Sequence, residues 1–330
     1  MYFVKEVSYS DWCIFFKKCQ KTNMLQCWEY GEAKEKCSRW KAARFFILND
    51  KKETVALVQA LVVSIPFIGG IVRVNRGPIL LDNSSTSENN VEIFEIISAL
   101  LKEFQRKHWW VVQIAPEVNK TDFGAVRLMG LGLRKLKLPP YASGLINLSV
   151  EESNLLSNLK KKWRYYLKKG QKISVKIDSL QGNSAQIEVL LNKYKKLQED
   201  KEFSGLSSSL ISELASQSSA EWEFSLFEAN ENDHKKNDDP LGMLVSIRHG
   251  DTATYLIGLT NNKGRSFQVN YVLLWEAILH SKQAGCTWFD IGGLDSTTPK
   301  GIRHFKSGVG SELYDLIGEW RGVLYPWKQL

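Results

Sequence analysis

The chain has 330 residues, a formal net charge of +8, 43% hydrophobic residues and 11 Trp. Because this length exceeds what one hydrophobic core usually serves, we expect two domains, and the hydrophobic content excludes a disordered chain. The positive charge favours an acidic partner, namely RNA, a nucleotide-linked substrate or an anionic membrane surface.

The cysteines and the first residues indicate a cytoplasmic protein. The five Cys show no C-x-x-C spacing and the five His are scattered, so we expect reduced thiols, no disulfides and no metal site. The opening string, MYFVKEVSYSDW, includes acidic side chains and lacks the apolar core of a signal peptide. No window reaches the roughly 18–20 apolar residues of a membrane-spanning helix.

The N-terminal part of the chain reads as a mixture of strands and helices. Strands are predicted over 44–48, 54–64, 72–81 and 109–115, and helices over 8–19 and 91–107. The polar residues 49–52 form the turn between the first two strands. Residues 138–148 form a connector and a strand that lead into the second half.

One amphipathic helix is predicted to open the second half. Ser149 and Glu152 fit the S-x-x-E capping box, and Gly170 fits the helix stop. Its apolar face consists of Leu155, Leu159, Trp163 and Tyr166 or Leu167. Its basic face has no acidic residue and consists of Lys160, Lys161, Arg164, Lys168 and Lys169. Such a face binds RNA or a substrate diphosphate, or it is an ordinary solvated surface, and the sequence leaves both open.

A helix and a group of strands follow. The helix is predicted over 187–197, and strands over 222–227, 242–247 and 252–258 form an antiparallel meander with an exposed tip at 228–240. Tyr255 lies in the last of these strands, where a tyrosine is either half-buried packing or a substrate contact.

Residues 255–310 carry the clearest chemical signal. An apolar strand is followed by a polar loop and by a helix that begins at Val269 and stops at Gly285, in the C′ position. Free N–H groups at such a helix start favour an anion, and Lys263 and Arg265 add positive charge. The loop is therefore a candidate phosphate site, and a plain helix start is the alternative.

The two halves repeat one order of elements. Strand and loop at 76–85, a helix at 91–107 and a strand at 109–115 match strand and loop at 257–264, a helix at 269–284 and a strand at 287–293. Residue identity between the two is negligible. Element order alone therefore suggests two copies of one α/β unit.

Two motifs resemble a known family. FDIGG, followed by GIRHFKSGVG, is similar to the end of the second domain in the FemABX family of non-ribosomal peptidyl transferases, which keeps a Phe-Lys pair there. By this resemblance Phe305 and Lys306, set between glycines, are the catalytic pair, and Arg303 binds substrate. The earlier string Q-x-W-x-x-G-x-x-K resembles the family's substrate-side motif. It makes Lys34 a ligand of the substrate phosphates, with Lys36 as the alternative.

The resemblance covers further positions. Tyr255 lies where the family has a substrate-contacting tyrosine. Where the family often has an arginine before a phenylalanine, this chain has Lys201 and Phe203, and lysine lacks the bidentate fork of arginine. Lys201 is thus a candidate substrate contact. The family also opens its second domain with a basic helix.

The resemblance implies an α/β fold of two tandem GNAT-like acyltransferase domains, with mixed sheets flanked by helices. No coiled-coil arm like that of FemA and FemB is present, so the FemX type is the nearer match. Residues 1–148 plus 315–330 would form the first domain, on the acceptor side, and 149–314 the second, on the donor side. The segment 316–324 would return as a strand of the first domain.

The implied activity is transfer of an amino acid from aminoacyl-tRNA to an amine of a nucleotide- or lipid-linked peptidoglycan precursor. Such an activated ester needs positioning and charge stabilisation but no covalent intermediate, which agrees with the absence of a G-x-S-x-G motif. Two alternatives stay open: an acyl-CoA-dependent N-acyltransferase acting on an amino sugar or lipid-linked saccharide, and a non-catalytic RNA-binding module. We expect no resident cofactor, no DNA partner and a monomer, with a peripheral position at the inner membrane face left open.

Overall fold

The computed structural model describes residues 1–66, 69–81, 87–173, 175–181, 185–202, 205–231 and 239–324. Phe203, most of the predicted tip at 228–240 and the last six residues of the predicted first domain, 325–330, lie outside this range. The chain forms two compact units. Unit 1 comprises Met1–Ala142, Asp295–Thr297 and Tyr314–Leu330, and unit 2 comprises Ser143–Leu294 and Thr298–Leu313.

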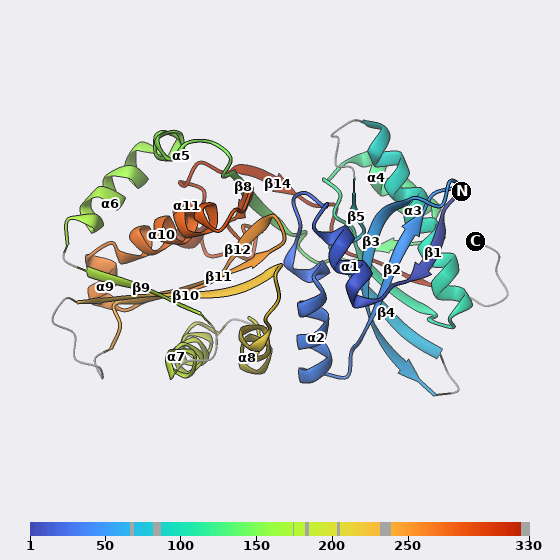
Figure 1. Cartoon of the computed structure of the whole chain (residues 1–330), viewed down its shortest axis with the longest axis horizontal. Coiled ribbons are helices and arrows are strands. Elements are labelled where there is room, and N and C mark those ends of the chain that lie inside the picture. Colours follow the sequence, from blue (N-terminus) through green and yellow to red (C-terminus); the bar gives the residue numbers. More distant parts are fainter. Residues whose placement is uncertain are drawn as a thin grey trace. The chain divides into compact units, whose positions relative to one another are not determined.

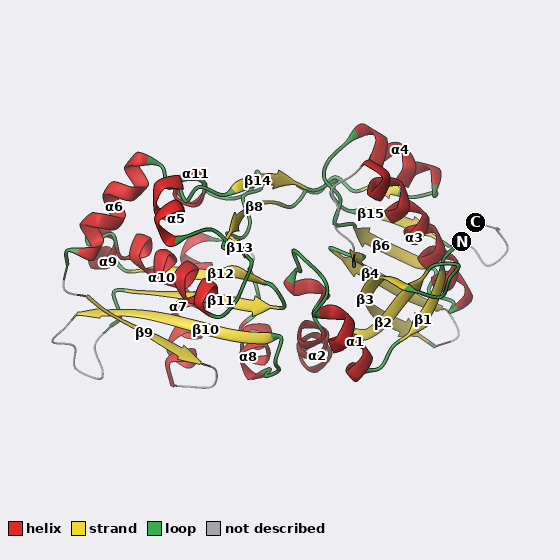
Figure 2. Ribbon diagram, turned by 45° about the horizontal axis from the view of Figure 1, so that its top comes forward, coloured by secondary structure: helices red, strands yellow, loops and turns green. Residues whose placement is uncertain are grey.

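Unit 1 contains a mixed sheet with helices on both faces (Figures 1 and 2). Its described strands are β1 (Phe3–Glu6), β2 (Lys41–Leu48), β3 (Thr54–Ile65), β4 (Gly69–Asn75), β5 (Ile79–Leu80), β6 (Val111–Ala115), β7 (Arg134–Lys135) and β15 (Trp320–Val323). Its described helices are α1 (Tyr9–Phe16), the 3-10 turn η1 (Met24–Gln26), α2 (Trp28–Cys37), α3 (Ser87–Arg106) and α4 (Asp122–Gly130). The strand order is β1-β2-β3-β4-β6-β15-β7, and β5 pairs with β3.

The core of unit 1 lies between this sheet and helices α3 and α4. Alternation along the strands and helical spacing along α3 turn one face of each inward. The buried residues include Val72, Val74, Phe94, Ile97, Val112 and Ile114. The strand β15 pairs antiparallel with both β6 and β7, so the end of the chain returns to the sheet of unit 1, as the family resemblance implied.

The predicted strand at 72–81 is in fact two strands. Arg76 has a positive φ of 49°, which interrupts the extended backbone, and Pro78 has no N–H to donate to a neighbour. The other predicted strands and the helix at 91–107 are confirmed, with bounds that differ by a few residues.

Unit 2 contains a second mixed sheet, of order β14-β8-β13-β12-β11-β10-β9. Its described strands are β8 (Ala142–Asn147), β9 (Val175–Gln181), β10 (Trp222–Glu231), β11 (Gly242–His249), β12 (Thr252–Thr260), β13 (Trp288–Asp290) and β14 (Glu312–Asp315). Its described helices are α5 (Glu152–Asn158), α6 (Lys161–Gln171), α7 (Ala185–Lys201), α8 (Ser208–Ser216), α9 (Asn262–Ser266), α10 (Val269–Gln283) and α11 (Lys300–Lys306). Helices α6 and α10 cover one face, and α7 and α8 cover the other (Figure 2). Among the described helices, none has the length and apolarity needed to cross a membrane.

The single helix predicted at 149–170 is wrong, because two helices occupy this segment. Leu159 and Lys160 have ψ angles of 136° and 144°, which break the helix between α5 and α6. The Lys160 N–H donates to the Gly308 carbonyl at 3.0 Å instead of continuing the helix. The break lets Leu155, Leu159 and Trp163 all reach the same core.

Neither of the predicted end signals of that helix is used. The N-cap of α5 is Glu151 without a side-chain bond, so Ser149 and Glu152 form no capping box. Gly170 lies inside α6, where a Cβ would come within 2.6 Å of Val272 Cγ2. Gly170 therefore permits close packing of α6 on α10 and does not end the helix.

Candidate functional site

A cleft opens in unit 2 where the parallel strands β12 and β13 part. The two strands pair only from Thr252 to Thr254, and β12 then continues to Thr260 without this neighbour. The equivalent strands of unit 1, β4 and β6, stay paired along the whole of β6. The difference between the units is that β4 ends at its last pair with β6, whereas β12 runs on for six residues beyond its last pair with β13.

A β-bulge lies at the point where the strands separate. Val245 of β11 pairs with Ile257, while Ser246 pairs with Tyr255, so Leu256 has no partner on β11. A bulge changes the direction of the neighbouring side chains and bends the strand. Here it lies beside Tyr255, which lines the cleft.

The cleft has a volume of about 730 Å³ and is lined by residues of unit 2. One wall is formed by α7 with Lys193 and Lys196. The other parts come from β11, β12, the α9 segment, the start of α10 and α11. Of the predicted site residues, Tyr255, Arg265 and Phe305 line it directly.

Lys306 lies beside this cleft with its ammonium group held in place. Lys306 is only 7% exposed, and its Nζ donates to the Gly293 carbonyl at 3.5 Å. Nζ also lies 4.5 Å from the centre of the Tyr255 ring. Phe305 and Lys306, which the sequence sets between glycines, form the end of helix α11. A cation in such a poorly solvated position interacts strongly with any nearby negative charge.

Tyr255 forms the surface on which Lys306 rests. Burial raises the pKa of its hydroxyl far above the ordinary value, so the ring stays neutral at physiological pH. A Cβ on Gly258 would lie 1.9 Å from Tyr255 Oη, so only glycine leaves room for the hydroxyl. Gly292 has a φ of +70°, and a Cβ there would lie 2.6 Å from the Tyr255 carbonyl oxygen.

Phe305 is fixed by two other aromatic rings. It stacks on Trp163 with ring centres 6.1 Å apart, and it meets Tyr271 edge to face at 5.0 Å. The indole Nε1 of Trp163 donates to the Phe305 carbonyl at 3.0 Å. The sequence assigned Trp163 only to a helix face and did not single out Tyr271. Both orient the ring that Phe305 presents to the cleft.

Asp290 is a buried residue that the sequence analysis missed. It is 2% exposed, and its Oδ1 accepts hydrogen bonds from the Gly292 N–H at 2.8 Å and from the Ser143 hydroxyl. These bonds fix the turn that presents the Gly293 carbonyl to Lys306. Its position at the end of the predicted strand, in the string FDIGG, is the sequence signal that could have identified it.

The polar loop predicted before α10 is largely the short helix α9. Asn261 caps it by accepting the Gly264 N–H at 2.8 Å, a signal that the N-cap preference of Asn could have revealed. Arg265 lines the cleft, and its Nη1 donates to the Thr260 carbonyl at 2.6 Å. Lys263 instead pairs with Glu231 at 2.5 Å. The start of α10 at Val269 and its end before Gly285, which has a φ of +84°, are confirmed.

Comparisons with known proteins agree with this architecture. A family model for FemAB proteins matches residues 177–329. A crystal structure of FemX has a TM-score of 0.77 and 16% identity, and the match covers 97% of both chains. The FemAB family model thus covers just under half of the chain, and the FemX structure shares the fold of nearly all of it.

The curated relatives match over a shorter range. The lipid II:glycine glycyltransferase of Staphylococcus aureus is 30% identical over 102 residues, which are 29% of this chain and 24% of that protein. The match thus spans about a quarter of the relative's length. A tandem GNAT protein from the clavulanic acid biosynthesis pathway has a TM-score of 0.57 and 8% identity, covering 99% of this chain and 100% of that one. The tandem GNAT-like fold is therefore shown.

The basic face that the sequence left open to RNA, a substrate diphosphate or solvent lies on α6 and its N-cap residue Lys160. Lys160, Lys161, Lys168 and Lys169 are exposed. The guanidinium of Arg164 instead donates to the carbonyls of Ser157 at 2.7 Å and Leu159 at 3.0 Å, which ties α6 to the end of α5. None of these five residues is among the described residues that line the cleft.

Two further residues, Lys201 and Arg303, were predicted to contact the substrate. Lys201 is the last residue of α7, and its side chain lies outside the described part of the structure. Arg303 is exposed on α11 and donates to the Thr298 carbonyl at 3.1 Å.

In unit 1, most of the Q-x-W-x-x-G-x-x-K motif serves packing. The Gln26 amide donates to the carbonyls of Gln59 and Asn75, and the Trp28 ring lies 3.6 Å from the Arg44 guanidinium carbon. A Cβ on Gly31 would lie 2.3 Å from Gln59 Oε1. The motif thus fixes α2 against the sheet. The half-buried Lys34 and the exposed Lys36 follow on the same helix.

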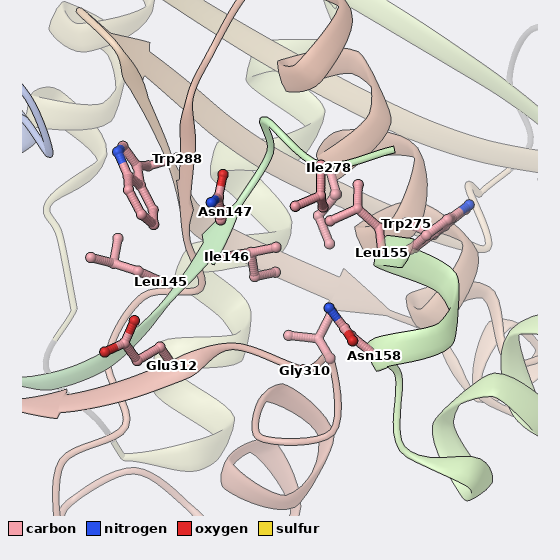
Figure 3. A pocket seen from close by; sticks show the side chains of 12 residues that line it. Leu145, Ile146, Asn147, Leu155, Asn158, Trp275, Ile278, Trp288, Gly310 and Glu312 are labelled. Carbon is pink, nitrogen blue, oxygen red and sulfur yellow. The ribbon is translucent and has the colours of Figure 1, made fainter. Parts of the chain in front are cut away.

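Unit 2 also contains a smaller pocket, of about 200 Å³ (Figure 3). Its walls come from β8, α5, α10 and residues 309–312, and they are mainly apolar, with Ile146, Leu155 and Ile278 among them. Of the described residues that line this pocket, none was predicted as a site residue. The larger cleft beside Lys306 is therefore the candidate site.

Proposed function

We propose that this chain is an enzyme that transfers an amino acid from aminoacyl-tRNA to an amine of a peptidoglycan precursor. The match of residues 177–329 to the FemAB family model and the partial match to a lipid II:glycine glycyltransferase support this proposal. The observation that carries it is the buried ammonium group of Lys306, held beside an open cleft by Gly293 and Tyr255.

The donor is proposed to bind in the cleft of unit 2. The 3′ end of aminoacyl-tRNA offers an adenine ring, phosphates and an ester. Phe305, braced by Trp163 and Tyr271, presents an aromatic surface on which a base can stack. Arg265 and the α7 residue Lys196 line the same cleft and supply positive charge for phosphates.

Lys306 is proposed to stabilise charge during transfer. The neutral acceptor amine attacks the ester carbonyl, and negative charge develops on the carbonyl oxygen as the C–N bond forms. The nearby ammonium of Lys306 compensates this charge. The C–O bond to the ribose then breaks, and the proton lost by the amine ends on the ribose hydroxyl, directly or through water. The ester is already activated, so the proposed reaction needs no resident cofactor.

The acceptor is proposed to be a precursor stem peptide whose diphosphate is contacted by Lys34 or Lys36 of unit 1. Lipid II appears in the name of the glycyltransferase relative, so a lipid-linked acceptor is the first to test. The reaction would take place in the cytoplasm, where charged tRNA is available.

A donor-exchange experiment tests the proposal. The protein is incubated with lipid-linked or nucleotide-linked precursor and with either tRNA charged with a labelled amino acid or labelled acetyl-CoA. We expect label on the precursor only with charged tRNA, and none after RNase treatment of the donor. Transfer from acetyl-CoA, or transfer that survives RNase, would replace the tRNA proposal by the acyl-CoA alternative. RNA binding without consumption of any donor would indicate a binding module.

A further inference from the structure

Helix α4 of unit 1, labelled in Figure 1, carries exposed apolar side chains. Phe123, Val126 and Met129 are 51%, 62% and 55% exposed, and their spacing of three residues places them on one side. The opposite side carries the fully buried Leu128, which packs in the core of unit 1. Phe123 meets the core residue Phe94 edge to face at 6.1 Å, whereas Val126 and Met129 are not part of the described core cluster.

The same region is strongly basic. Between residues 120 and 138 the chain has one acidic residue, Asp122, and five basic residues: Lys120, Arg127, Arg134, Lys135 and Lys137. All five basic residues are exposed, and in the described part of the chain none is within ion-pair distance of a carboxylate. Leu138, which is 49% exposed, adds a fourth apolar side chain at the end of this segment.

We propose that α4 and residues 131–138 form a surface, here called the α4 surface, that docks on an anionic phospholipid bilayer. Exposed apolar side chains flanked by unpaired lysine and arginine are the two features that interfacial binding needs, because the first enter the headgroup boundary and the second neutralise lipid charge. RNA binding would use the basic residues but would leave Val126 and Met129 without a role.

The α4 surface shares no residue with the candidate site, since its residues belong to unit 1 and those that line the cleft belong to unit 2. The proposal therefore does not depend on the proposed transfer reaction. If both hold, docking would concentrate the enzyme at the membrane that carries a lipid-linked acceptor. Because only one short helix and a few apolar residues are involved, binding is expected to be reversible and sensitive to salt.

Vesicle sedimentation with the full chain tests the docking. Vesicles of phosphatidylcholine alone are compared with vesicles that also contain phosphatidylglycerol, without donor or acceptor. We expect binding only to the anionic vesicles, and weaker binding as salt rises. Replacing Lys120 and Lys137 by Gln removes two basic groups and is expected to weaken binding roughly 25-fold at low salt. Lys51→Gln with Lys52→Gln, on the turn after β2, is the matched control and should bind like the wild type.

A second pair of variants tests the apolar face. Val126→Gln with Met129→Gln keeps helix-forming residues and is expected to weaken binding about tenfold or more. Ile14→Gln with Leu313→Gln removes side chains of similar exposure, 55% and 61%, from other surfaces and should have no effect. The proposal is overturned if anionic vesicles are not bound at low salt, or if the α4 variants bind as well as their controls. Transfer to a soluble acceptor, measured in parallel, should be equal in all four variants. If the wild-type protein does not transfer, the proposed reaction is rejected, and the result of the vesicle-binding test is unaffected.

Discussion

Replacing Lys306 by Met is expected to remove transfer activity while the protein still unfolds cooperatively. The substitution loses a cation–π contact with Tyr255, worth roughly 2 kcal/mol when desolvated, and one long hydrogen bond to Gly293, worth about 1 kcal/mol. It also removes the cost of keeping an ammonium group largely out of water, which is several kcal/mol. The free energy of unfolding should therefore change little or rise.

The effect on the reaction should be much larger. If Lys306 compensates charge on the ester oxygen, its loss should lower kcat by roughly a hundredfold to a thousandfold, as for other preorganised donors to an oxyanion. Lys300→Met, at the exposed start of the same helix, is the matched control and should keep its activity. Single-turnover transfer from labelled aminoacyl-tRNA measures the rate, and thermal unfolding measures the fold. A folded Lys306→Met variant with near wild-type turnover would refute the role of the ammonium group.

Three other predictions follow from individual contacts. Gly258→Ala should lower transfer at least about tenfold, measured as kcat, because its Cβ would displace the Tyr255 ring from beneath the ammonium group; unchanged kcat would contradict this geometry. Arg76→Met should destabilise unit 1 by roughly 3 kcal/mol, measured by chemical denaturation, because it leaves the half-buried Glu117 without its bidentate partner. Adding Glu117→Gln to this variant should restore part of the lost stability. Burial raises the pKa of the Cys286 thiol to about 12, so iodoacetamide at pH 8 should modify it only after unfolding; rapid labelling of the native protein would show that the thiol is accessible.

Much of the fold could be predicted because the signals are local. Strand alternation, the amphipathic pattern of α3 and the stop at Gly285 depend on residues close together in the sequence. The break between α5 and α6 could not be predicted, because it depends on the Lys160 N–H meeting the carbonyl of Gly308, far along the chain. For the same reason Gly170 looked like a helix stop, although its neighbour in space is Val272.

The sequence motif indicated candidate residues of the site, but it did not indicate the shape of the cleft. The motif singled out Phe305 and Lys306 as candidates. The cleft that Phe305 and Tyr255 line depends on the path of β12 beyond its last pair with β13 at Thr254, which no local pattern reveals. Positive charge alone also suggested phosphate contacts at residues that interact with the protein itself. Arg164 and Lys263 are basic residues in suitable segments, yet both bind groups of the protein itself.

The central claim is that the 3′ end of the donor occupies the cleft of unit 2. An RNA minihelix ending in 8-azidoadenosine, irradiated with the protein and mapped by mass spectrometry, tests this directly. The account predicts crosslinks within residues 255–265 or 300–306, and their loss when unmodified aminoacyl-tRNA competes. Competed crosslinks confined to unit 1 would contradict it.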